Sequence, residues 1–264
     1  MNKLTVVTIT YNNLKGLMRT ADSVHSKFCP LAANDQIEHV IVDGGSDDGT
    51  IEYCLSLKSN SSIPVNFRSE RDFGIYDAMN KGVRRSSGDF LVFINAGDEV
   101  HDTLNVQKLF EMLEGISSEK SVAGLALCSE MKFLRSSLLI ASRYVDACSP
   151  RMPSVHQSMV YKRSILLDIP YDSSFKVCGD YQNFVRILLS GLKFKAFDMV
   201  FSVFYAGGVS SRSPLLLFRE SVEISFEFFD LSLIEKLILS FRLAVSLIGL
   251  QVLLLIYGID EQKS

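Results

Sequence analysis

Short apolar runs alternate with amphipathic stretches along the first hundred residues of the chain. β-branched and aliphatic runs of strand length predict strands at residues 4–10, 37–44, 65–70 and 89–97. Apolar residues at helical spacing predict intervening helices at residues 14–28, 50–58 and 74–86. Strand and helix in alternation indicate right-handed βαβ units, and therefore an α/β fold with a mostly parallel sheet flanked by helices.

The pattern changes after residue 100. A helix is predicted at residues 103–115, and two strands that we expect to pair antiparallel follow at residues 121–134 and 136–145. A loop with two prolines leads into a further strand, and the chain then continues with a helix at 178–191 and a strand with a glycine turn at 193–211. Because no linker rich in Pro, Gly or Ser separates these parts, we expect one domain with halves 1–100 and 101–212, followed by C-terminal helices over 213–264.

Polar residues follow each of the four strands predicted in the first half. They are Thr10 and Tyr11 after the first strand, Asp43 after the second, residues 68–72 after the third and residues 95–98 after the fourth. In open parallel sheets, ligands bind in the crevice outside the carboxyl ends of the strands. The four strand ends are therefore predicted to face one binding crevice.

The stretch "VDGGSDDGT" (residues 42–50) forms an acidic, glycine-rich turn after the second strand. A phosphate cradle relies on bare backbone N–H groups, whereas Asp43, Asp47 and Asp48 would repel a phosphate. The turn is better suited to hydrogen-bond donors, such as a base N–H or sugar hydroxyls, or to a metal that bridges to phosphate. We interpret Asp47 and Asp48 as turn and helix-capping residues.

Composition excludes several other functions. The formal net charge of −3 gives no basic field, so nucleic acid is not an expected partner. The five cysteines are scattered and never form a C-x-x-C pair, which argues against a disulfide framework and against a zinc site and favours a reducing cytosol. The apolar stretch at the start is too short for the core of a signal peptide.

Several separate blocks carry a family resemblance. They are "VVTITYNN", "VDGGSDDGT", "SERDFGIYDAMNKGVRRSSGDFLVFINAGDE", "HQSMVYKRS" and "FKVCGDYQNFVR". In this order, across about residues 3–210, the chain resembles the inverting, nucleotide-sugar-dependent glycosyltransferases of family 2. The likeness is greatest to the bacterial enzymes that assemble O-antigen and colanic-acid type exopolysaccharide repeat units, and hence lipopolysaccharide. The resemblance implies a Rossmann-like GT-A fold, a donor that is usually UDP-linked, and a divalent metal, Mg²⁺ or Mn²⁺.

The same resemblance implies roles for residues of the first half. Thr8, Thr10 and Tyr11 would border the nucleoside, and Asp43 would accept the N–H of the base. The remaining implied donor-binding residues are Asp72 and Asn80 in the pocket, and Arg71 or Lys81 at the diphosphate. The alternative is that Asp72 caps the next helix and that Lys81 belongs to a solvated helix face.

The sequence "INAGD" occupies the position of the family's D-x-D or D-x-D-D metal motif. A carboxylate there binds a hard cation that neutralises charge on the departing nucleotide. This chain has Asn95 and Gly97 at the other two acidic positions, and Asp98 keeps the carboxylate. We expect Asp98 to bind the metal, and Asn95 to ligate it or to hold the ribose; the alternative is a plain turn.

An inverting transfer needs a general base for the acceptor hydroxyl, and the resemblance assigns this role to Asp180. An Asp in the first turn of a helix also serves as a favourable partner of the helix dipole, which is the alternative. The resemblance makes His156 a pocket histidine near the leaving diphosphate or the acceptor, whereas a lone His ahead of a strand can also be structural. His25, His39 and His101 are interpreted as packing or surface residues.

The C-terminal part contains an uncharged apolar run from Leu243 to Ile259, preceded by Lys236 and Arg242. It is a core helix, a marginal membrane span or an interfacial helix, and we favour the interfacial helix. This placement suits a peripheral enzyme on the cytoplasmic face of the inner membrane that acts on a polyprenyl-diphosphate-linked saccharide. A non-catalytic nucleotide-sugar-binding scaffold is the alternative function, and a nucleotidyltransferase is disfavoured because "TITYNNLKG" lacks a first loop rich in glycine and basic residues.

Overall fold

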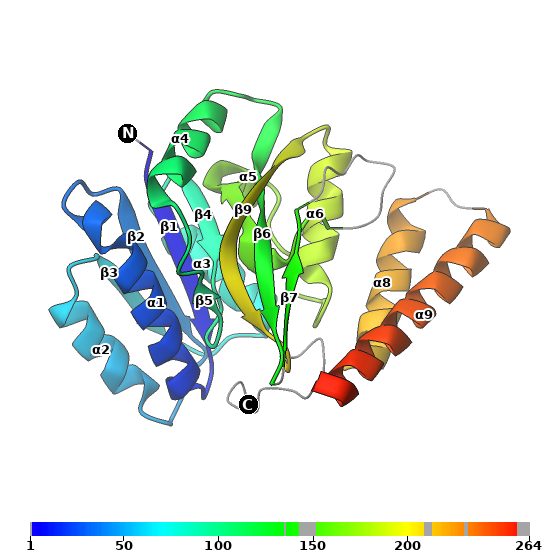
Figure 1. Cartoon of the computed structure of the whole chain (residues 1–264), viewed down its shortest axis with the longest axis horizontal. Coiled ribbons are helices and arrows are strands. Elements are labelled where there is room, and N and C mark those ends of the chain that lie inside the picture. The colour runs from blue at the N-terminus through cyan, green and yellow to red at the C-terminus, as the bar shows by residue number, and fades with distance from the viewer. Residues whose placement is uncertain (1, 135, 143–151, 209–212, 230–231, 258–264) are drawn as a thin grey trace.

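A mixed sheet forms the centre of the molecule. The computed structural model describes residues 2–134, 136–142, 152–208, 213–229 and 232–257. Within these ranges the sheet has nine strands in the order β3-β2-β1-β4-β8-β6-β9-β5, and β7 pairs with β6 beside this path (Figure 1). Because one continuous sheet runs through both predicted halves, the two halves are built on a single scaffold.

The first half is a parallel α/β unit, as predicted. Its strands are β1 (Leu4–Thr10), β2 (Ile37–Asp43), β3 (Val65–Ser69) and β4 (Phe90–Phe93). The connecting helices are α1 (Leu14–Ala32), α2 (Thr50–Asn60) and α3 (Ile75–Arg85). Thr10 pairs with Asp43 and Asp43 with Ser69, so the strand ends that carry the predicted site residues lie at one edge of the sheet.

The second half adds strands in both directions. The predicted antiparallel pair is confirmed by β6 (Val122–Lys132) and β7 (Ser137–Ile140). Between β4 and β6 lies β8 (Met159–Lys162), antiparallel to both, whereas β9 (Lys193–Tyr205) runs parallel to β6 and pairs with the short β5 (Glu99–Val100). The helices here are α4 (Val106–Ser117), the short α5 (Arg163–Asp168) and α6 (Gly179–Leu189), together with a 3₁₀ turn at His156–Ser158.

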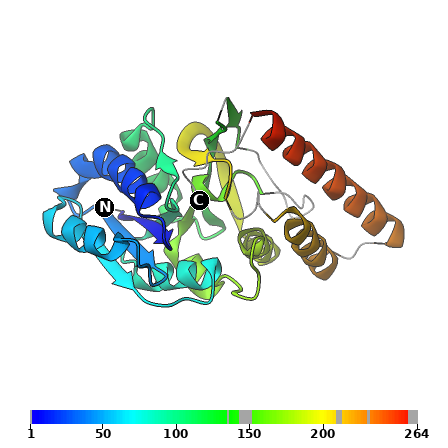
Figure 2. The ribbon, with the colours of Figure 1, turned by 90° about the horizontal axis from the view of Figure 1, so that it is seen from below.

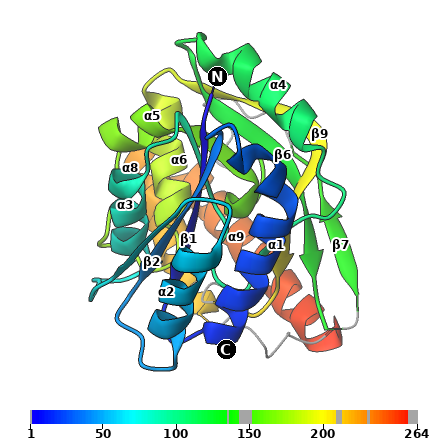
Figure 3. The same cartoon turned by 90° about the vertical axis from the view of Figure 1, so that its left-hand side faces the viewer.

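Helices cover both faces of the sheet. Figure 3 shows α3, α5 and α6 on one face and α1 and α4 on the other. The alternation of β1 fits this arrangement, since Val7 and Ile9 pack with the first group and Leu4 and Val6 with the second. Each fully buried aliphatic side chain contributes roughly 1.5–3 kcal/mol. Two apolar cores therefore hold the strand ends in register.

Two helices, α8 (Pro214–Phe228) and α9 (Leu233–Tyr257), follow at the end of the molecule opposite α1 and α2 (Figures 1 and 2). Ile224 of α8 is fully buried in the core that also contains α3 and α6. In contrast, Phe241 is 70% exposed and Leu255 is 84% exposed on α9. The structure thus packs α8 against the main body of the protein and leaves α9 at its margin. Residue 212, where we predicted a boundary, and Ile259 lie outside the described ranges.

Among the described residues, one helical stretch, Lys236–Tyr257, is long and apolar enough to cross a membrane by length and composition. None of its apolar window is buried inside the protein. A core helix would have at least one buried face, so the first of the three interpretations of this segment does not fit. Docking on a membrane and crossing it both remain compatible with this exposure.

Candidate functional site

A cleft of about 1260 Å³ opens where the carboxyl ends of β1 and β4 face the start of α6. Both halves of the domain contribute to it, and α8 and α9 close one end. Seven of the residues predicted from the sequence line this cleft: Thr10, Tyr11, Asp72, Asn95, Asp98, His156 and Asp180. Residues after β1, β3 and β4 therefore meet at one cleft, whereas the fourth predicted strand end, that of β2, does not line it.

Asp43 lies behind the cleft wall rather than among its lining residues. Its carboxylate is fully buried, and Oδ2 accepts hydrogen bonds from Ser69 Oγ at 2.6 Å and from the backbone N–H groups of Gly45 and Ser46 at 3.1 and 3.0 Å. Ser46 Oγ donates a further hydrogen bond to Oδ1. The carboxylate thus satisfies the donors of its own turn, and its predicted contact with the base stays a prediction.

The rest of the acidic turn is fastened to the end of β1. Asp48 accepts from the backbone N–H groups of Leu14 at 2.9 Å and Thr50 at 3.1 Å, at the first residues of α1 and α2. This confirms the capping interpretation of Asp48. Asn12 adopts a positive φ of 46° and donates its backbone N–H to Ser46 Oγ at 2.7 Å. The two loops are consequently locked to each other.

Four other residues predicted to bind the donor lie outside the lining set. Thr8 is fully buried, with Oγ1 2.9 Å from His39 Nε2 and donating to the carbonyl of Ile94 at 2.8 Å. Asn80 bonds the backbone of Tyr171 twice, at 2.8 and 3.0 Å. Lys81 donates to the carbonyl of Arg71 at 2.7 Å and pairs with two carboxylates, Glu70 and Asp77. Thr8 and Asn80 are therefore buried behind the cleft wall, whereas the side chain of Arg71 is exposed outside the lining set.

Tyr11 and Asp72 form the accessible part of the same wall. Tyr11 is 64% exposed. Asp72 Oδ1 accepts from the backbone N–H of Gly74 at 2.9 Å, which leads the chain into α3. A Cβ at Gly44 would lie 2.7 Å from Asp72 Oδ2 and 3.2 Å from the Tyr11 ring, so only glycine allows both side chains to approach the turn.

Two polar atoms at the ends of β1 and β4 are buried without a hydrogen-bond partner in the described part of the chain. They are Thr10 Oγ1 and Asn95 Oδ1, and both residues line the cleft. A buried polar atom that lacks a partner costs about 1–3 kcal/mol. Such a cost at a cleft wall indicates a position where a ligand group completes the hydrogen bonding.

Asp98 is fully buried next to Asn95. It accepts from Gln157 Nε2 at 2.9 Å and from the backbone N–H of Tyr205 at 3.2 Å. No group of three or more His, Cys, Asp and Glu side chains that could hold a metal occurs within the described ranges. One carboxylate and the Asn95 oxygen fit a cation that keeps most of its ligands as water and substrate phosphate, as Mg²⁺ does.

Asp180 lies in the first turn of α6, as predicted, and faces the cleft. The hydroxyl of Tyr76 lies 2.7 Å from the carbonyl oxygen of Val177 and 3.2 Å from Asp180 Oδ1, so its one proton is shared between these two acceptors. A Cβ at Gly179 would sit 2.7 Å from the Tyr76 ring, so the glycine permits this close packing. Burial, followed by the negative charge of Asp180, raises the pKa of Tyr76, which keeps its hydroxyl protonated.

The loop before Asp180 is held by a residue that the sequence did not reveal. Glu220 of α8 is buried, and its carboxylate accepts from the backbone N–H groups of Lys176, Val177 and Cys178 at 2.9, 2.9 and 2.8 Å. A carboxylate at these groups satisfies the orphan donors that precede a helix. An acidic residue inside an amphipathic helix carries no local signal for such a role.

His156 is enclosed by aromatic rings. Its ring centroid lies 5.1 Å from that of Phe93, and Nε2 lies 3.3 Å from the Tyr171 hydroxyl. Burial lowers the pKa of His156, while the charges of Asp180 and Asp98 act in the opposite direction. The neutral imidazole is therefore favoured. Its neighbour Gln157 contacts Asp98, a contact that was not predicted. In the sequence, the only indication of it was that polar residues stand directly ahead of a buried strand.

Residues 5–173 match the family described as Glycosyl transferase family 2. A glycosyltransferase of Mycobacterium tuberculosis, named as uncharacterised, is 29% identical over 189 residues, which cover 70% of this chain and 69% of that protein. A PGL/p-HBAD biosynthesis glycosyltransferase of Mycobacterium bovis is 24% identical over 182 residues, which cover 69% of this chain and 68% of the relative.

Solved structures show the same fold. The mannosyltransferase PcManGT from Pyrobaculum calidifontis, in complex with GDP-Man and Mn²⁺, superposes with a TM-score of 0.66 at 14% identity and covers 99% of this chain and 77% of the other. S. aureus TarS 1-349 in complex with UDP gives a TM-score of 0.57 at 17% identity, with 89% and 68% covered. A longer TarS chain is matched over 43% of its own length.

The family match extends over more than half of the chain and includes the strand ends, the acidic turn and His156. The fold likeness extends beyond it, through α6 with Asp180 and up to the C-terminal helices. Both agree with the alternation of strands and helices and with the cleft described above. The chain belongs to glycosyl transferase family 2, and it is a glycosyltransferase with the GT-A fold.

Proposed function

We propose that the protein is an inverting hexosyltransferase of surface polysaccharide assembly, such as that of O-antigen. It moves a sugar from a UDP-linked hexose or N-acetylhexosamine to a hydroxyl of a polyprenyl-diphosphate-linked saccharide. The observation that carries this proposal is the single cleft, in which the ends of β1 and β4 face Asp180 and His156. Its volume of about 1260 Å³ exceeds the ~300–1,000 Å³ of ordinary ligand pockets, which suits two substrates.

The proposed reaction is a single displacement. The acceptor hydroxyl attacks the anomeric carbon from the face opposite the nucleotide, and Asp180 takes the hydroxyl proton. The bond between the anomeric carbon and the diphosphate oxygen breaks, and the nucleoside diphosphate leaves with the electron pair. Tyr76, by its hydrogen bond to Asp180, orients the carboxylate for this step.

The donor is proposed to bind the wall formed by residues 1–100. Thr10 and Tyr11 would border the nucleoside, and Asp72 and Asn95 the sugar or ribose. Support comes from the unpartnered Thr10 and Asn95 oxygens, and from TarS structures that contain UDP or UDP-GlcNAc. Residues that do not line the cleft, namely Thr8, Asp43, Arg71, Asn80 and Lys81, are proposed to hold the shape of this wall. Residues 101–212 are proposed to form the acceptor side.

A divalent metal is proposed to accompany the donor diphosphate, held by Asp98 and by the oxygen of Asn95. When bound, the cation neutralises charge that develops on the leaving diphosphate. Gln157 and the backbone N–H of Tyr205 fix the orientation of the Asp98 carboxylate, whichever oxygen faces the diphosphate. His156, neutral and close to both acidic residues, is proposed to contact the diphosphate or the acceptor.

We also propose that the protein is attached to the cytoplasmic face of the inner membrane through α9. The exposed apolar side chains of this helix support the attachment, and Lys236 and Arg242 can each add about 1 kcal/mol next to anionic lipid. This location would bring the cleft to a lipid-linked acceptor.

A panel of UDP-, GDP- and dTDP-linked sugars tests the proposal, with a synthetic lipid-diphosphate saccharide as acceptor. We expect one donor class to give a transferred product in which NMR shows inversion at the anomeric carbon. Saturable UDP-sugar binding without transfer or hydrolysis for any donor would instead support the non-catalytic binding protein. Transfer with retention would remove Asp180 from the role of base in a single displacement.

A further inference from the structure

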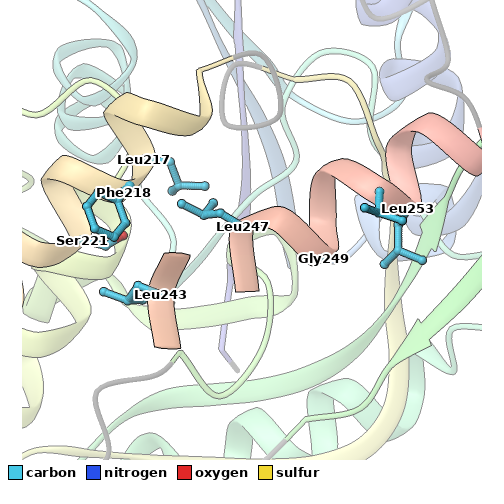
Figure 4. Close-up of a pocket in the computed structure, with 8 residues that line it drawn as sticks. Leu217, Phe218, Ser221, Leu243, Leu247, Gly249 and Leu253 are labelled. Atoms are coloured by element: carbon cyan, nitrogen blue, oxygen red, sulfur yellow. The ribbon is translucent and has the colours of Figure 1, made fainter. Parts of the chain in front are cut away.

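A second, apolar hollow of about 800 Å³ lies between α8 and α9. Figure 4 shows the side chains of both helices around it. Seven of its eight lining residues have no polar side chain, and the eighth contributes one hydroxyl: Leu217, Phe218, Ser221, Leu243, Leu247, Gly249, Val252 and Leu253. We call this hollow the α8/α9 groove.

The groove adjoins the catalytic cleft. Leu217, Ser221 and Leu243 line both hollows, so the two meet at these three residues. Two cationic residues, Lys176 and Arg242, line the cleft together with Asp180. The combined hollow therefore contains a carboxylate for a hydroxyl group, cations for an anion, and a purely apolar end.

We infer that the α8/α9 groove binds the hydrocarbon chain of the acceptor, a polyprenyl diphosphate that carries the saccharide. In this arrangement Arg242 and Lys176 attract the diphosphate, and the sugar hydroxyl reaches Asp180. The inference rests on the proposed function, because it assigns a place to the lipid part of that same acceptor. It also separates the two faces of α9: the groove face takes the substrate, and the exposed face with Phe241, Ile248 and Leu255 meets the membrane.

Charge and continuity favour this occupant over a second copy of the chain or a bilayer lipid. A docked helix would need only the apolar part, and would leave the cations and the carboxylate of the cleft without a role. In a prenyl-diphosphate-linked saccharide, the hydrocarbon chain matches the apolar groove, the diphosphate matches the cations, and the sugar hydroxyl matches the carboxylate of Asp180. Each methylene removed from water gives about a fourfold gain in affinity, so a long chain gains much from such a groove.

Gly249 offers a way to fill the groove without disturbing the fold. A Cβ built there meets no atom within 4 Å. We expect Gly249→Phe to lower kcat/KM for a long-chain acceptor, relative to the same saccharide diphosphate on a short chain, by at least tenfold. The matched control is Ile248→Phe, which places the same ring on the exposed face of α9, where Ile248 is 64% exposed, and should leave that ratio unchanged.

The result that overturns the inference is an unchanged chain-length ratio in Gly249→Phe, or an equal fall in Ile248→Phe. A fall shared by the two variants would show that membrane contact, rather than the groove, governs acceptor use. In both cases transfer by the wild type would still support the proposed function. Failure of the wild type to transfer any sugar would count against that function. Whether the groove binds a prenyl chain would then be decided by a second measurement.

The second measurement needs no transfer reaction. The full-length protein in phospholipid nanodiscs is irradiated with a benzophenone-bearing farnesyl diphosphate, and the labelled residues are identified by mass spectrometry. We expect adducts on Leu217, Leu243 or Leu247 that excess farnesyl diphosphate suppresses, and weaker labelling in Arg242→Gln. Adducts confined to the exposed face of α9, or insensitive to the competitor, would show a bilayer contact and overturn the groove assignment.

Discussion

The two walls of the cleft are built on different principles. On the wall formed by residues 1–100, Asp43, Thr8 and Asn80 form hydrogen bonds to other groups of the protein. On the opposite wall, Asp180 and His156 line the cleft, together with other polar residues such as Gln157, Lys176 and Arg242. The motifs that are most conspicuous in the sequence thus mainly fix loop shape, whereas a few side chains opposite them face the reaction. Substitutions should separate in the same way, into losses of stability and losses of turnover.

The largest effect is expected at Asp98, which lies where the walls meet. Asp98→Ala should lower kcat by several orders of magnitude through loss of the metal, and should lower the free energy of unfolding by about 1–3 kcal/mol because Gln157 and the Tyr205 N–H lose their acceptor. Turnover with Mg²⁺, Mn²⁺ or chelator and a denaturant titration measure the two effects. Asp98→Asn is the control that keeps an acceptor, and full activity in chelator would exclude the metal.

Asp180→Asn should lower turnover with little effect on stability, as expected for a residue of the wall opposite residues 1–100. Loss of a general base costs about 10²- to 10⁴-fold in kcat, while donor KM should stay within a few-fold. The melting temperature should change little, since an amide oxygen can still accept from Tyr76. Asp168→Asn, an exposed change on α5, serves as the control. A variant that lost UDP binding but kept kcat would move Asp180 to the donor side of the comparison.

Asp43→Asn should show the opposite behaviour. The new amide cannot accept from all the donors that converge on the carboxylate, so the free energy of unfolding should fall by about 3 kcal/mol. Donor KM should rise with the loss of loop shape, while kcat at saturating donor should fall much less than in Asp180→Asn. Urea unfolding and steady-state kinetics measure both, with Asp47→Asn, an exposed neighbour, as control. Unchanged stability with lost UDP binding would instead favour direct contact with the base.

The pH dependence of stability sharpens the comparison further. Burial lowers the pKa of His39, behind Thr8, to about 3, and His25 lowers it as well. In the unfolded state His39 binds a proton below about pH 6.5, whereas in the folded state it does so only below about pH 3. The free energy of unfolding therefore falls as the pH falls from 6.5 to 3. His39 should account for about 2 kcal/mol of loss at pH 5. Urea titrations at pH 8 and pH 5 should show that loss reduced in His39→Gln; an equal loss in both proteins would contradict it.

The smallest effect on folding is expected from removing α9. A chain ending at residue 229 keeps α8 with Glu220 and Ile224, and loses a helix whose apolar window is unburied. Its stability should lie within about 1 kcal/mol of the full chain, since little apolar surface leaves the protein interior. It should no longer sediment with liposomes, and should still use a short detergent-dispersed acceptor. Aggregation or loss of the thermal transition would show that α9 belongs to the folded core.

Carbonate extraction of the full-length protein divides the remaining options for α9. An interfacial helix should be released by carbonate, and a membrane span should stay with the lipid. Release would support the proposed peripheral attachment, and retention would replace it with a span.

Much of the fold was predictable because its signals are local. The strands β1, β2 and β3 begin and end within one residue of their predicted positions, since apolar runs of strand length mark them directly, whereas β4 ends at Phe93, four residues before its predicted end. The insertion of β8 between β4 and β6 was not predicted, because the paired residues lie about seventy positions apart for β4 and about thirty-five for β6, and such distant pairing leaves no mark in either strand. The strand directions of the second half are accordingly more mixed than the alternation suggested.

The candidate site divides in the same way. Asp180 and Asp98 were placed in the cleft by motifs, and the structure brings them there with His156. The residues that position them, Tyr76 and Glu220, were missed because each acts across a long stretch of chain on a residue with no complementary pattern. Thr8 and Asn80, which the resemblance makes donor-binding residues, are buried and form hydrogen bonds within the protein, so their contact with the donor stays a prediction.

The hydrogen bonds of Glu220 also set an order of events during synthesis. Chains fold from the N-terminus as they emerge from the ribosome. The nascent parallel unit can form its β1 to β4 pairing once residue 93 has emerged, but the backbone before Asp180 has no acceptor for its three N–H groups until residue 220 follows. The half proposed to bind the nucleotide is therefore synthesised well before the half proposed to supply the base is complete, and we expect a chain terminated before residue 220 to bind a donor without transferring its sugar.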